Sequence, residues 1–207
     1  MLSKEIVLIG YSGHGLVVGD TVLTLGLPLK YYTEVKAVEH NLFGLSYLGC
    51  ESANDFIGWS RDYEYVLGIG NNRIRTELGH LVKKNRKSLL NVVHPSADLT
   101  HYMNIGIGNF VSKQVVVNVN ASIGDFCILN TGSIIEHDCH IGNGVHIAPG
   151  AVLAGNVTVG DSTFVGANAV IKQGVTIGRN VTIGAGAVII RNIPDNKVVV
   201  GNPSREL

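Results

Sequence analysis

The carboxyl-terminal half of the chain places a branched aliphatic residue at every sixth position. This register begins at Leu99 and reaches Ile189 without a break, a run of sixteen residues. Neither an α-helix, with about 3.6 residues per turn, nor a strand that alternates every two residues generates such a period. The pattern predicts a parallel β-helix, in which each six-residue unit forms a short strand and a corner and three units close one triangular coil.

Small or β-branched side chains stand two residues before many of these aliphatic positions. They include Ala121, Cys127, Ser133, Cys139, Ala151, Thr163, Ala169 and Ala187. We expect the aliphatic side chains to point inward, the small ones to fill the narrow corners, and Gly, Asn and Asp to supply positive φ angles there. Residues 18 apart should therefore stack, with about five coils between Leu99 and Asn192.

Residues 1–93 follow a different pattern, in which short apolar runs alternate with glycine loops and amphipathic stretches. The predicted elements are a strand at Glu5–Ile9, a helix from Leu16 to Leu25, a strand at Tyr65–Ile69, a helix from Arg73 to Lys84 and a strand at Ser88–Val93. This order is typical of a small Rossmann-like α/β domain with a parallel sheet. We therefore expect an α/β domain over residues 1–93 and a β-helix with a short tail over residues 94–207, divided near His94–Pro95.

Composition narrows the class of protein. The 207 residues include 16 basic and 16 acidic side chains, and charged residues make up only 15% of the chain. A nucleic-acid binder needs a basic face, so we expect no nucleic-acid partner. The uncharged stretches are interrupted by Gly, Asn and Ser, which argues against a membrane span. Three cysteines without a CxxC spacing and an amino terminus unlike a signal peptide favour a cytoplasmic protein.

The glycine loop after the first predicted strand is a candidate anion site. Gly10, Gly13 and Gly15 join this strand to a helix amino terminus, where unpaired N–H groups face a ligand. The spacing is not GxGxxG, which argues against a nicotinamide cofactor. A nucleotide or sugar-diphosphate ligand and a tight turn without ligand both remain open. Gly70, after the second predicted strand, should line the same crevice.

The repeat half carries one dense polar cluster, from Asn130 to His140, with His146 beyond it. His137 is flanked by Glu136 and Asp138, and a carboxylate can orient an imidazole for proton transfer, so we interpret His137 as a general base. Metal ligation is the weaker alternative, because His140 and His146 are six residues apart and should lie on successive faces. Cys139 falls on the inward small-residue position and should serve packing.

The stacking rule suggests a further residue. Gly155 lies 18 positions after His137, so it should occupy the same corner one coil further on. A glycine there would let its backbone N–H approach an acyl carbonyl closely. We therefore expect Gly155 to act as an oxyanion donor, with a plain corner glycine as the alternative.

Five motifs follow one another in an order that resembles the NeuD/PglD-type bacterial sugar acyltransferases over nearly the whole chain. They are Gly10-x-Ser12-Gly13-His14-Gly15, Gly68-Ile-Gly70-Asn71-Asn72, Asn91-Val-Val-His94-Pro95, Glu136-His137-Asp138 and Gly201-Asn202-Pro203. The resemblance implies a left-handed β-helix, a homotrimer, and acetyl-CoA bound as co-substrate, without a metal, in the groove between adjacent helices.

The resemblance also assigns roles to single residues. It makes His137 the general base and Asp138 the acid that tunes it, and it places acetyl-CoA contacts at His146, Ala167 and Ala185. The contacts with a nucleotide sugar carry over to Ser12, Gly13, His14 and Gly70. Where better-known members have an acidic pair near the end of the second strand, this chain has Glu34 alone.

The function expected from the sequence is N-acetylation of a nucleotide-linked 4-amino sugar by direct transfer from acetyl-CoA. The alternatives are O-acetylation of a sugar such as sialic acid and a non-catalytic trimer that binds a nucleotide sugar. A γ-type carbonic anhydrase, which would need a metal, is a third. The resemblance implies a place in bacterial polysaccharide or glycoprotein glycan synthesis.

Overall fold

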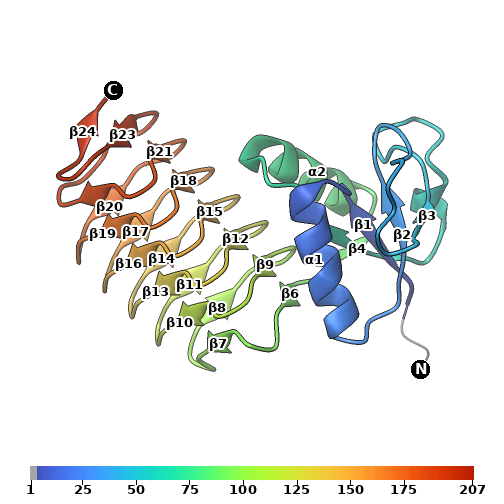
Figure 1. The fold of residues 1–207 in the computed structure, drawn as a ribbon, viewed down its shortest axis with the longest axis horizontal. Coiled ribbons are helices and arrows are strands. Elements are labelled where there is room, and N and C mark those ends of the chain that lie inside the picture. Colours follow the sequence, from blue (N-terminus) through green and yellow to red (C-terminus); the bar gives the residue numbers. More distant parts are fainter. Residues whose placement is uncertain (1–3) are drawn as a thin grey trace. The chain divides into compact units, whose positions relative to one another are not determined.

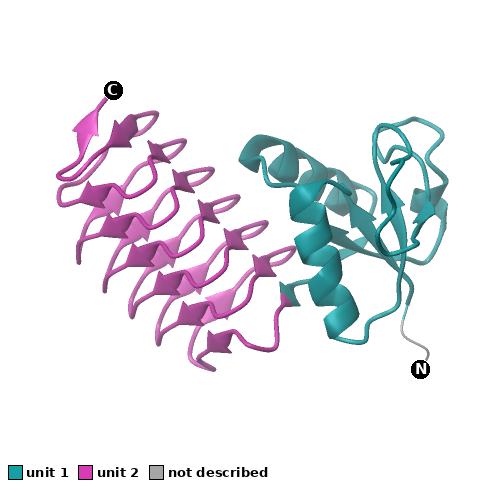
Figure 2. Ribbon diagram, viewed as in Figure 1, with its two compact units in different colours: residues 1–92 teal, residues 93–207 magenta. Residues whose placement is uncertain are grey.

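The amino-terminal unit is built around one parallel sheet. The computed structural model describes residues 4–207, and this unit ends at Val92 (Figure 2). The predicted first strand forms β1, Ile6–Ile9, whose four residues are all buried, as in a parallel strand covered on both faces. The other elements are α1 (Gly13–Thr24), β2 (Leu29–Thr33), β3 (Ser46–Tyr47), the 3₁₀ helix η1 (Ile57–Ser60), β4 (Glu64–Leu67), α2 (Asn72–Lys84) and β5 (Ser88–Leu89).

The order of the strands reverses direction at β1. The sheet has the order β3-β2-β1-β4-β5, so the chain leaves β1 toward β2 on one side and later returns to β4 on the other. In open α/β sheets, ligands bind outside the carboxyl ends of the strands where the order reverses in this way. The glycines that follow β1 and β4 lie at this edge.

Helix α1 begins three residues earlier than predicted. Its N-cap is Ser12, and the first helical hydrogen bond runs from the Leu16 N–H to the Ser12 carbonyl at 2.9 Å. The prediction of a start at Leu16 was wrong because glycine has low helix propensity, and the Gly-rich segment was taken for a loop. Residues 13–15 are therefore the first turn of the helix, where backbone N–H groups lack intrahelical acceptors.

The predicted strand at Ser88–Val93 is also corrected. It divides into β5 (Ser88–Leu89), which pairs with β4, and β6 (Val92–Val93), which lies beside β9 in the β-helix. Each piece has only two residues, one of them buried and apolar, and so short a run does not indicate which sheet it joins. The six-residue register consequently starts at Val93, one unit before Leu99.

The carboxyl-terminal unit, Val93–Leu207, is a left-handed parallel β-helix of three sheets, whose coils Figure 1 shows stacked along one axis. Residues 18 apart pair in register, as Leu129 does with Ile147. The first sheet has β6, β9 (Phe110–Val111), β12 (Ile128–Leu129), β15 (His146–Ile147), β18 (Phe164–Val165), β21 (Thr182–Ile183), β23 (Val198–Val200) and β24 (Arg205–Glu206). The second has β7 (Asp98–Leu99), β10 (Val116–Val117), β13 (Ile134–Ile135), β16 (Val152–Leu153), β19 (Val170–Ile171) and β22 (Val188–Ile189). The third has β8 (Asn104–Ile105), β11 (Ser122–Ile123), β14 (His140–Ile141), β17 (Thr158–Val159) and β20 (Thr176–Ile177).

The core of the coil confirms the inward aliphatic positions. From Val111 to Ile189 every aliphatic residue of the register is at most 4% exposed, and the small residues that precede them are fully buried. The corners use positive φ, as expected, including Asn120 at 61° and Asp138 at 62°. Asn and Asp tolerate this conformation better than most non-glycine residues.

The last coil differs from the others. Partners there lie 16 residues apart, as Ile177 and Ile193 do, and β24 runs antiparallel to β23. Among the described residues, no helix is both long and apolar enough to cross a membrane.

Candidate active site

His137 and Asp138 occupy the corner between β13 and β14. The Nδ1 atom of His137 lies 2.8 Å from Oδ2 of Asp138, and about half of each side chain is exposed. An ionised carboxylate only accepts hydrogen bonds, so we assign the proton of the neutral imidazole to Nδ1. The lone pair is then on Nε2, which can accept a proton from a nucleophile.

The second oxygen of Asp138 is held from the preceding coil. The Asn120 side-chain amide donates to Oδ1 at 2.6 Å. This hydrogen bond, followed by that from His137 and the charges of His137 and His140, holds the pKa of the Asp138 carboxyl below its usual range. The carboxylate that orients His137 therefore stays ionised.

The two acids that flank His137 do different things. Glu136 accepts a hydrogen bond from the Asn118 amide at 3.0 Å, one coil earlier. Asp138 is the acid that contacts the imidazole, so the orienting role falls to it.

Gly155 lies in the same corner one coil beyond His137, as the stacking rule predicted. A methyl group added at Gly155 would lie 2.6 Å from both Cε1 and Nε2 of His137. The glycine therefore leaves the space that the imidazole occupies, a reason for glycine that the sequence reasoning did not give. Its role as an oxyanion donor remains a prediction.

His146 is held in place by two neighbours. Its Nε2 atom lies 3.3 Å from the Asn130 amide nitrogen, and its ring meets Phe164 edge-on with ring centroids 5.0 Å apart. Asn130 and His146 come from neighbouring coils of one sheet. The imidazole is thus fixed before any ligand binds; its contact with acetyl-CoA remains a prediction.

The three histidines of the cluster do not converge. His140 lies on β14 and its Nδ1 is 2.8 Å from the Ser122 hydroxyl, whereas His146 lies on β15 in another sheet. Within residues 4–207 no three His, Cys, Asp or Glu side chains are grouped so that they could hold a metal ion. Cys139 packs inward, as expected, and burial raises the pKa of its thiol.

Ala167 and Ala185 stack on another corner, between β18 and β19 and between β21 and β22. The Gly186 N–H donates to the Ala167 carbonyl at 2.8 Å, which fixes the two turns one above the other. Both alanines are partly or fully exposed. This corner and the corner of His137 border the same sheet, that of β13, on its two sides.

In the amino-terminal unit, three glycines allow β1, α1 and β4 to meet. A methyl group at Gly15 or at Gly68 would collide with the Gly10 carbonyl oxygen. Only glycine permits such close backbone approach, which brings the first turn of α1 to the sheet edge. Ser12 and Gly13 are exposed there, and backbone N–H groups at a helix amino terminus can bind an anion.

His14 projects from this first turn beside the loop after β4. A methyl group at Gly70 would lie 3.7 Å from the His14 Cβ, so these two predicted site residues are neighbours. Burial, and then the charge of Arg75, lowers the pKa of His14 to about 4. The imidazole is consequently neutral at neutral pH.

Arg75 was missed by the sequence reasoning. It is 1% exposed, and its guanidinium donates to the carbonyls of Ile69 and Gly70 and to the Asn72 side chain at 2.9–3.1 Å. Arg75 thus holds the loop that faces His14. The sequence feature that could have identified Arg75 as buried was its position on the apolar side of α2, three residues before Leu78.

Glu34 follows β2 directly and reaches the glycine loop. One carboxylate oxygen accepts the Tyr11 N–H at 2.8 Å. An acid at the end of the second strand is the usual partner of ribose hydroxyls in this architecture. The contact places Glu34 next to the loop predicted to bind a diphosphate.

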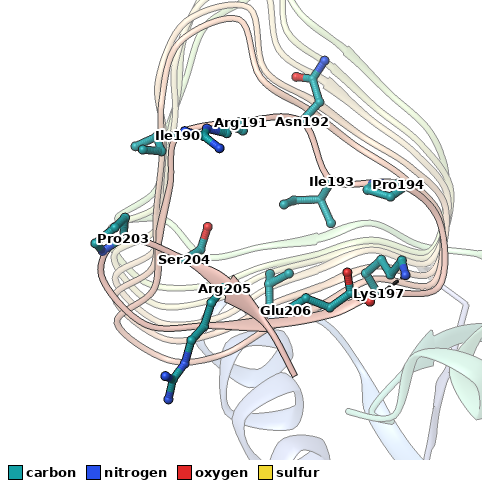
Figure 3. A pocket seen from close by; sticks show the side chains of 11 residues that line it. Ile190, Arg191, Asn192, Ile193, Pro194, Lys197, Pro203, Ser204, Arg205 and Glu206 are labelled. Atoms are coloured by element: carbon teal, nitrogen blue, oxygen red, sulfur yellow. Dashed lines mark hydrogen bonds and ion pairs between the residues drawn. The ribbon is translucent and has the colours of Figure 1, made fainter.

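The open end of the β-helix holds a separate cavity of about 330 Å³ (Figure 3). Ile193 points into it, while Lys197 pairs with Glu206 at its rim at 2.6 Å. None of the predicted site residues lines this cavity.

Two family comparisons cover the two units. Residues 5–82 match the family described as the PglD N-terminal domain, and residues 120–155 and 156–191 match that of the bacterial transferase hexapeptide (six repeats).

Solved structures match along nearly the whole chain. A variant of perosamine N-acetyltransferase from Caulobacter crescentus with one histidine replaced by asparagine, in complex with CoA and GDP-perosamine, is 31% identical. The match covers 100% of this chain and 98% of that one, with a TM-score of 0.93. The acetyltransferase domain of PglB from Neisseria gonorrhoeae, in complex with acetyl coenzyme A, is 32% identical over 99% of this chain and 100% of its own, with a TM-score of 0.92.

A curated relative matches over a shorter stretch. GDP-perosamine N-acetyltransferase from Escherichia coli O157:H7 is 36% identical over 79 residues, which are 38% of this chain and 36% of that protein.

Proposed function

Since the chain belongs to the NeuD/PglD-type bacterial sugar acyltransferases, which use acetyl-CoA, we propose that it N-acetylates a nucleotide-linked 4-amino sugar. The observation that carries this proposal is the end-to-end similarity to an enzyme solved with CoA and GDP-perosamine. The alternative of a carbonic anhydrase has no comparable support. The oriented pair of His137 and Asp138 favours an enzyme over a non-catalytic binding trimer.

The reaction needs one base and no covalent intermediate. With Nδ1 tied to Asp138, Nε2 of His137 accepts the proton of the sugar amine as its nitrogen attacks the thioester carbonyl. The oxygen of the tetrahedral intermediate is stabilised by the Gly155 N–H. The carbon–sulfur bond then breaks, and His137 returns its proton to the CoA thiolate. An amide and free CoA are the products.

The acceptor nucleotide is assigned to the amino-terminal unit. The first turn of α1, with Ser12 and Gly13, offers N–H groups to the diphosphate, and His14 and Gly70 line the same edge. Glu34 is positioned for the ribose or base. His146, Ala167 and Ala185 are assigned to acetyl-CoA.

A homotrimer would complete the site. The sheet of β13 turns an apolar stripe outward, made of Val116, Ile134, Val152, Val170 and Val188, whereas the outward residues of the sheet of β14 are polar. If the apolar sheets of three copies face a common axis, the corner of His137 in one copy meets the corner of Ala167 in the next. Acetyl-CoA would then lie between two copies, as the family resemblance implies.

Release of CoA thiol from acetyl-CoA tests the proposed function. The protein is given UDP-, dTDP- and GDP-linked 4-amino sugars and free sialic acid, with His137→Ala as control. Turnover on one nucleotide amino sugar that the variant loses is the expected result. Turnover on sialic acid alone would replace the proposal by O-acetylation. No turnover together with no binding of acetyl-CoA would favour a non-catalytic protein.

A further inference from the structure

Both oxygens of the Asp138 carboxylate accept hydrogen bonds from neighbouring side chains. Oδ2 of Asp138 accepts from His137 at 2.8 Å, and Oδ1 accepts from the Asn120 amide at 2.6 Å. Asn120 comes from the preceding coil, 18 residues earlier, so the contact follows from the stacking of the β-helix. The chain of contacts runs from Asn120 through Asp138 to the imidazole.

Without the hydrogen bond from Asn120, Asp138 would orient the imidazole of His137 poorly. Its side chain is 46% exposed, and exposed ion pairs between mobile side chains contribute little. A neutral amide donor restricts the carboxylate to the rotamer that faces His137 and adds no titrating charge. The Asn120 amide does not titrate, so this hydrogen bond does not depend on the protonation of its donor.

We propose that Asn120 is a positioning residue for the acetyl transfer, which it serves by fixing the Asp138 carboxylate against the general base. The proposal rests on the proposed function, because it requires His137 to act as the base. It extends that function to a residue outside the Glu136-His137-Asp138 motif.

A purely structural reason for Asn120 is the competing explanation. Its φ angle of 61° lies in the left-handed region, where Asn is favoured over most side chains. Asn180, with φ 53°, lies on a different corner, between β20 and β21, and its amide also donates to the next coil, to the Asn196 side chain at 3.3 Å. Asn180 is therefore a control with the same left-handed backbone and an amide donor to the next coil, away from His137.

Two substitutions separate the explanations. Asn120→Gly keeps the left-handed corner and removes the amide, while Asn120→Asp keeps the shape and places a negative charge beside Asp138. If Asn120 positions Asp138, we expect kcat/KM to fall roughly ten-fold in Asn120→Gly, the usual scale for a hydrogen bond to a charged group, and further in Asn120→Asp. Asn180→Gly should retain wild-type activity. Near-wild-type activity in both Asn120 variants would overturn the proposal.

A double-mutant cycle tests whether Asn120 acts through Asp138. In an Asp138→Asn background, Asn120→Gly should cause no further loss, because its effect passes through the carboxylate. Additive losses would show that Asn120 acts independently of Asp138 and would also overturn the proposal.

An NMR titration tests the contact without any sugar substrate. The Asp138 carboxyl carbon, which faces Asn120, His137 and His140, should titrate at a higher pKa in Asn120→Gly than in wild type. An unchanged pKa would show that the Asn120 amide does not stabilise the ionised Asp138 carboxylate. If the titration shifts while no sugar of the panel is accepted and acetyl-CoA is not bound, the contact stands and the proposed function fails.

Discussion

The imidazole of His137 rests on the backbone of Gly155, and there is no room for a single methyl group between them. The backbone of Gly155 is not in the left-handed region, so an alanine there meets no conformational strain. The steric limit therefore concerns the imidazole rather than the fold.

Gly155→Ala should displace the His137 ring and leave the β-helix folded. We expect kcat to fall by about 10²–10⁴, comparable to the loss of a general base, with little change in the thermal unfolding midpoint. Gly174→Asn is a control in the same corner one coil further on, one position later than the stacking partner of Gly155; its φ of 73° tolerates Asn, and it has open space beside it. Equal activity of Gly155→Ala and wild type would show that the imidazole is not needed where the structure places it.

His137→Ala should abolish most turnover without affecting substrate binding. The expected loss in kcat is about 10²–10⁴. Isothermal calorimetry with acetyl-CoA should give a Kd close to that of wild type, because the residues assigned to that ligand lie elsewhere, His146 on β15 and Ala167 and Ala185 on another corner. Near-normal turnover would mean that another group accepts the proton.

Asp138→Asn should be nearly as damaging as loss of the base, although it changes few atoms. An amide at this place can donate to Nδ1, which would move the imidazole proton to Nε2 and remove the lone pair that accepts the substrate proton. We expect a loss of kcat by about 10²–10⁴, measured at saturating substrates. A loss confined to KM would assign Asp138 to substrate binding instead.

The buried His14 should make the protein sensitive to acid. Its pKa is about 4 in the folded state and about 6.5 when unfolded, so between these values the unfolded chain binds more protons. The contribution of His14 to the free energy of unfolding is then fully present above pH 6.5. It is lost as the pH is lowered toward 4, which decreases the free energy of unfolding by about 1–3 kcal/mol. Urea unfolding at several pH values should show this slope, and His14→Gln should flatten it. A wild-type slope in His14→Gln would place the effect elsewhere.

Mixed trimers test whether two copies share the site. His137→Ala and Ala167→Trp should each be inactive alone, the second because the indole fills the corner assigned to acetyl-CoA. If each site takes its base from one copy and this corner from another, every trimer that contains both variants has one complete site, so the doubly selected protein should recover about a third of the wild-type sites. Co-expression with two affinity tags and assay of the doubly selected protein measures this. An inactive mixture would mean that one copy supplies both residues.

The β-helix was predictable because each coil repeats one geometry, so a six-residue period in the sequence leaves few other folds. The ends of the helices and strands in the amino-terminal unit were harder to predict. Gly13 and Gly15 have low helix propensity but both lie in α1; close packing against the Gly10 carbonyl requires glycine at position 15, whereas Gly13 has open space beside it. The segment 88–93 reads as one strand, although tertiary pairing sends residues 88–89 and 92–93 to different sheets.

A residue of the candidate site could be predicted where it belonged to a sequence motif or lay 18 residues, one coil, after a motif residue. The positions of His137, Asp138 and Gly155 were predicted in this way, and the structure brings them together at one corner, while their catalytic roles stay predictions. Asn120 was missed, although the same spacing of 18 applied backward from Asp138 points to it. Arg75 was missed because a buried guanidinium is rare and its main partners are backbone carbonyls, which leave no trace in a sequence.

The register of 18 also governs how the gene for such a protein can change in length. Removing one codon inside the coil would turn the following aliphatic residues out of the core and uncouple every later corner from the one beneath it. Removing or duplicating 54 nucleotides, one whole coil, would leave each remaining residue with equivalent neighbours. Descendants of this fold should therefore differ in length by whole coils, while the distance from His137 to its neighbours above and below stays fixed.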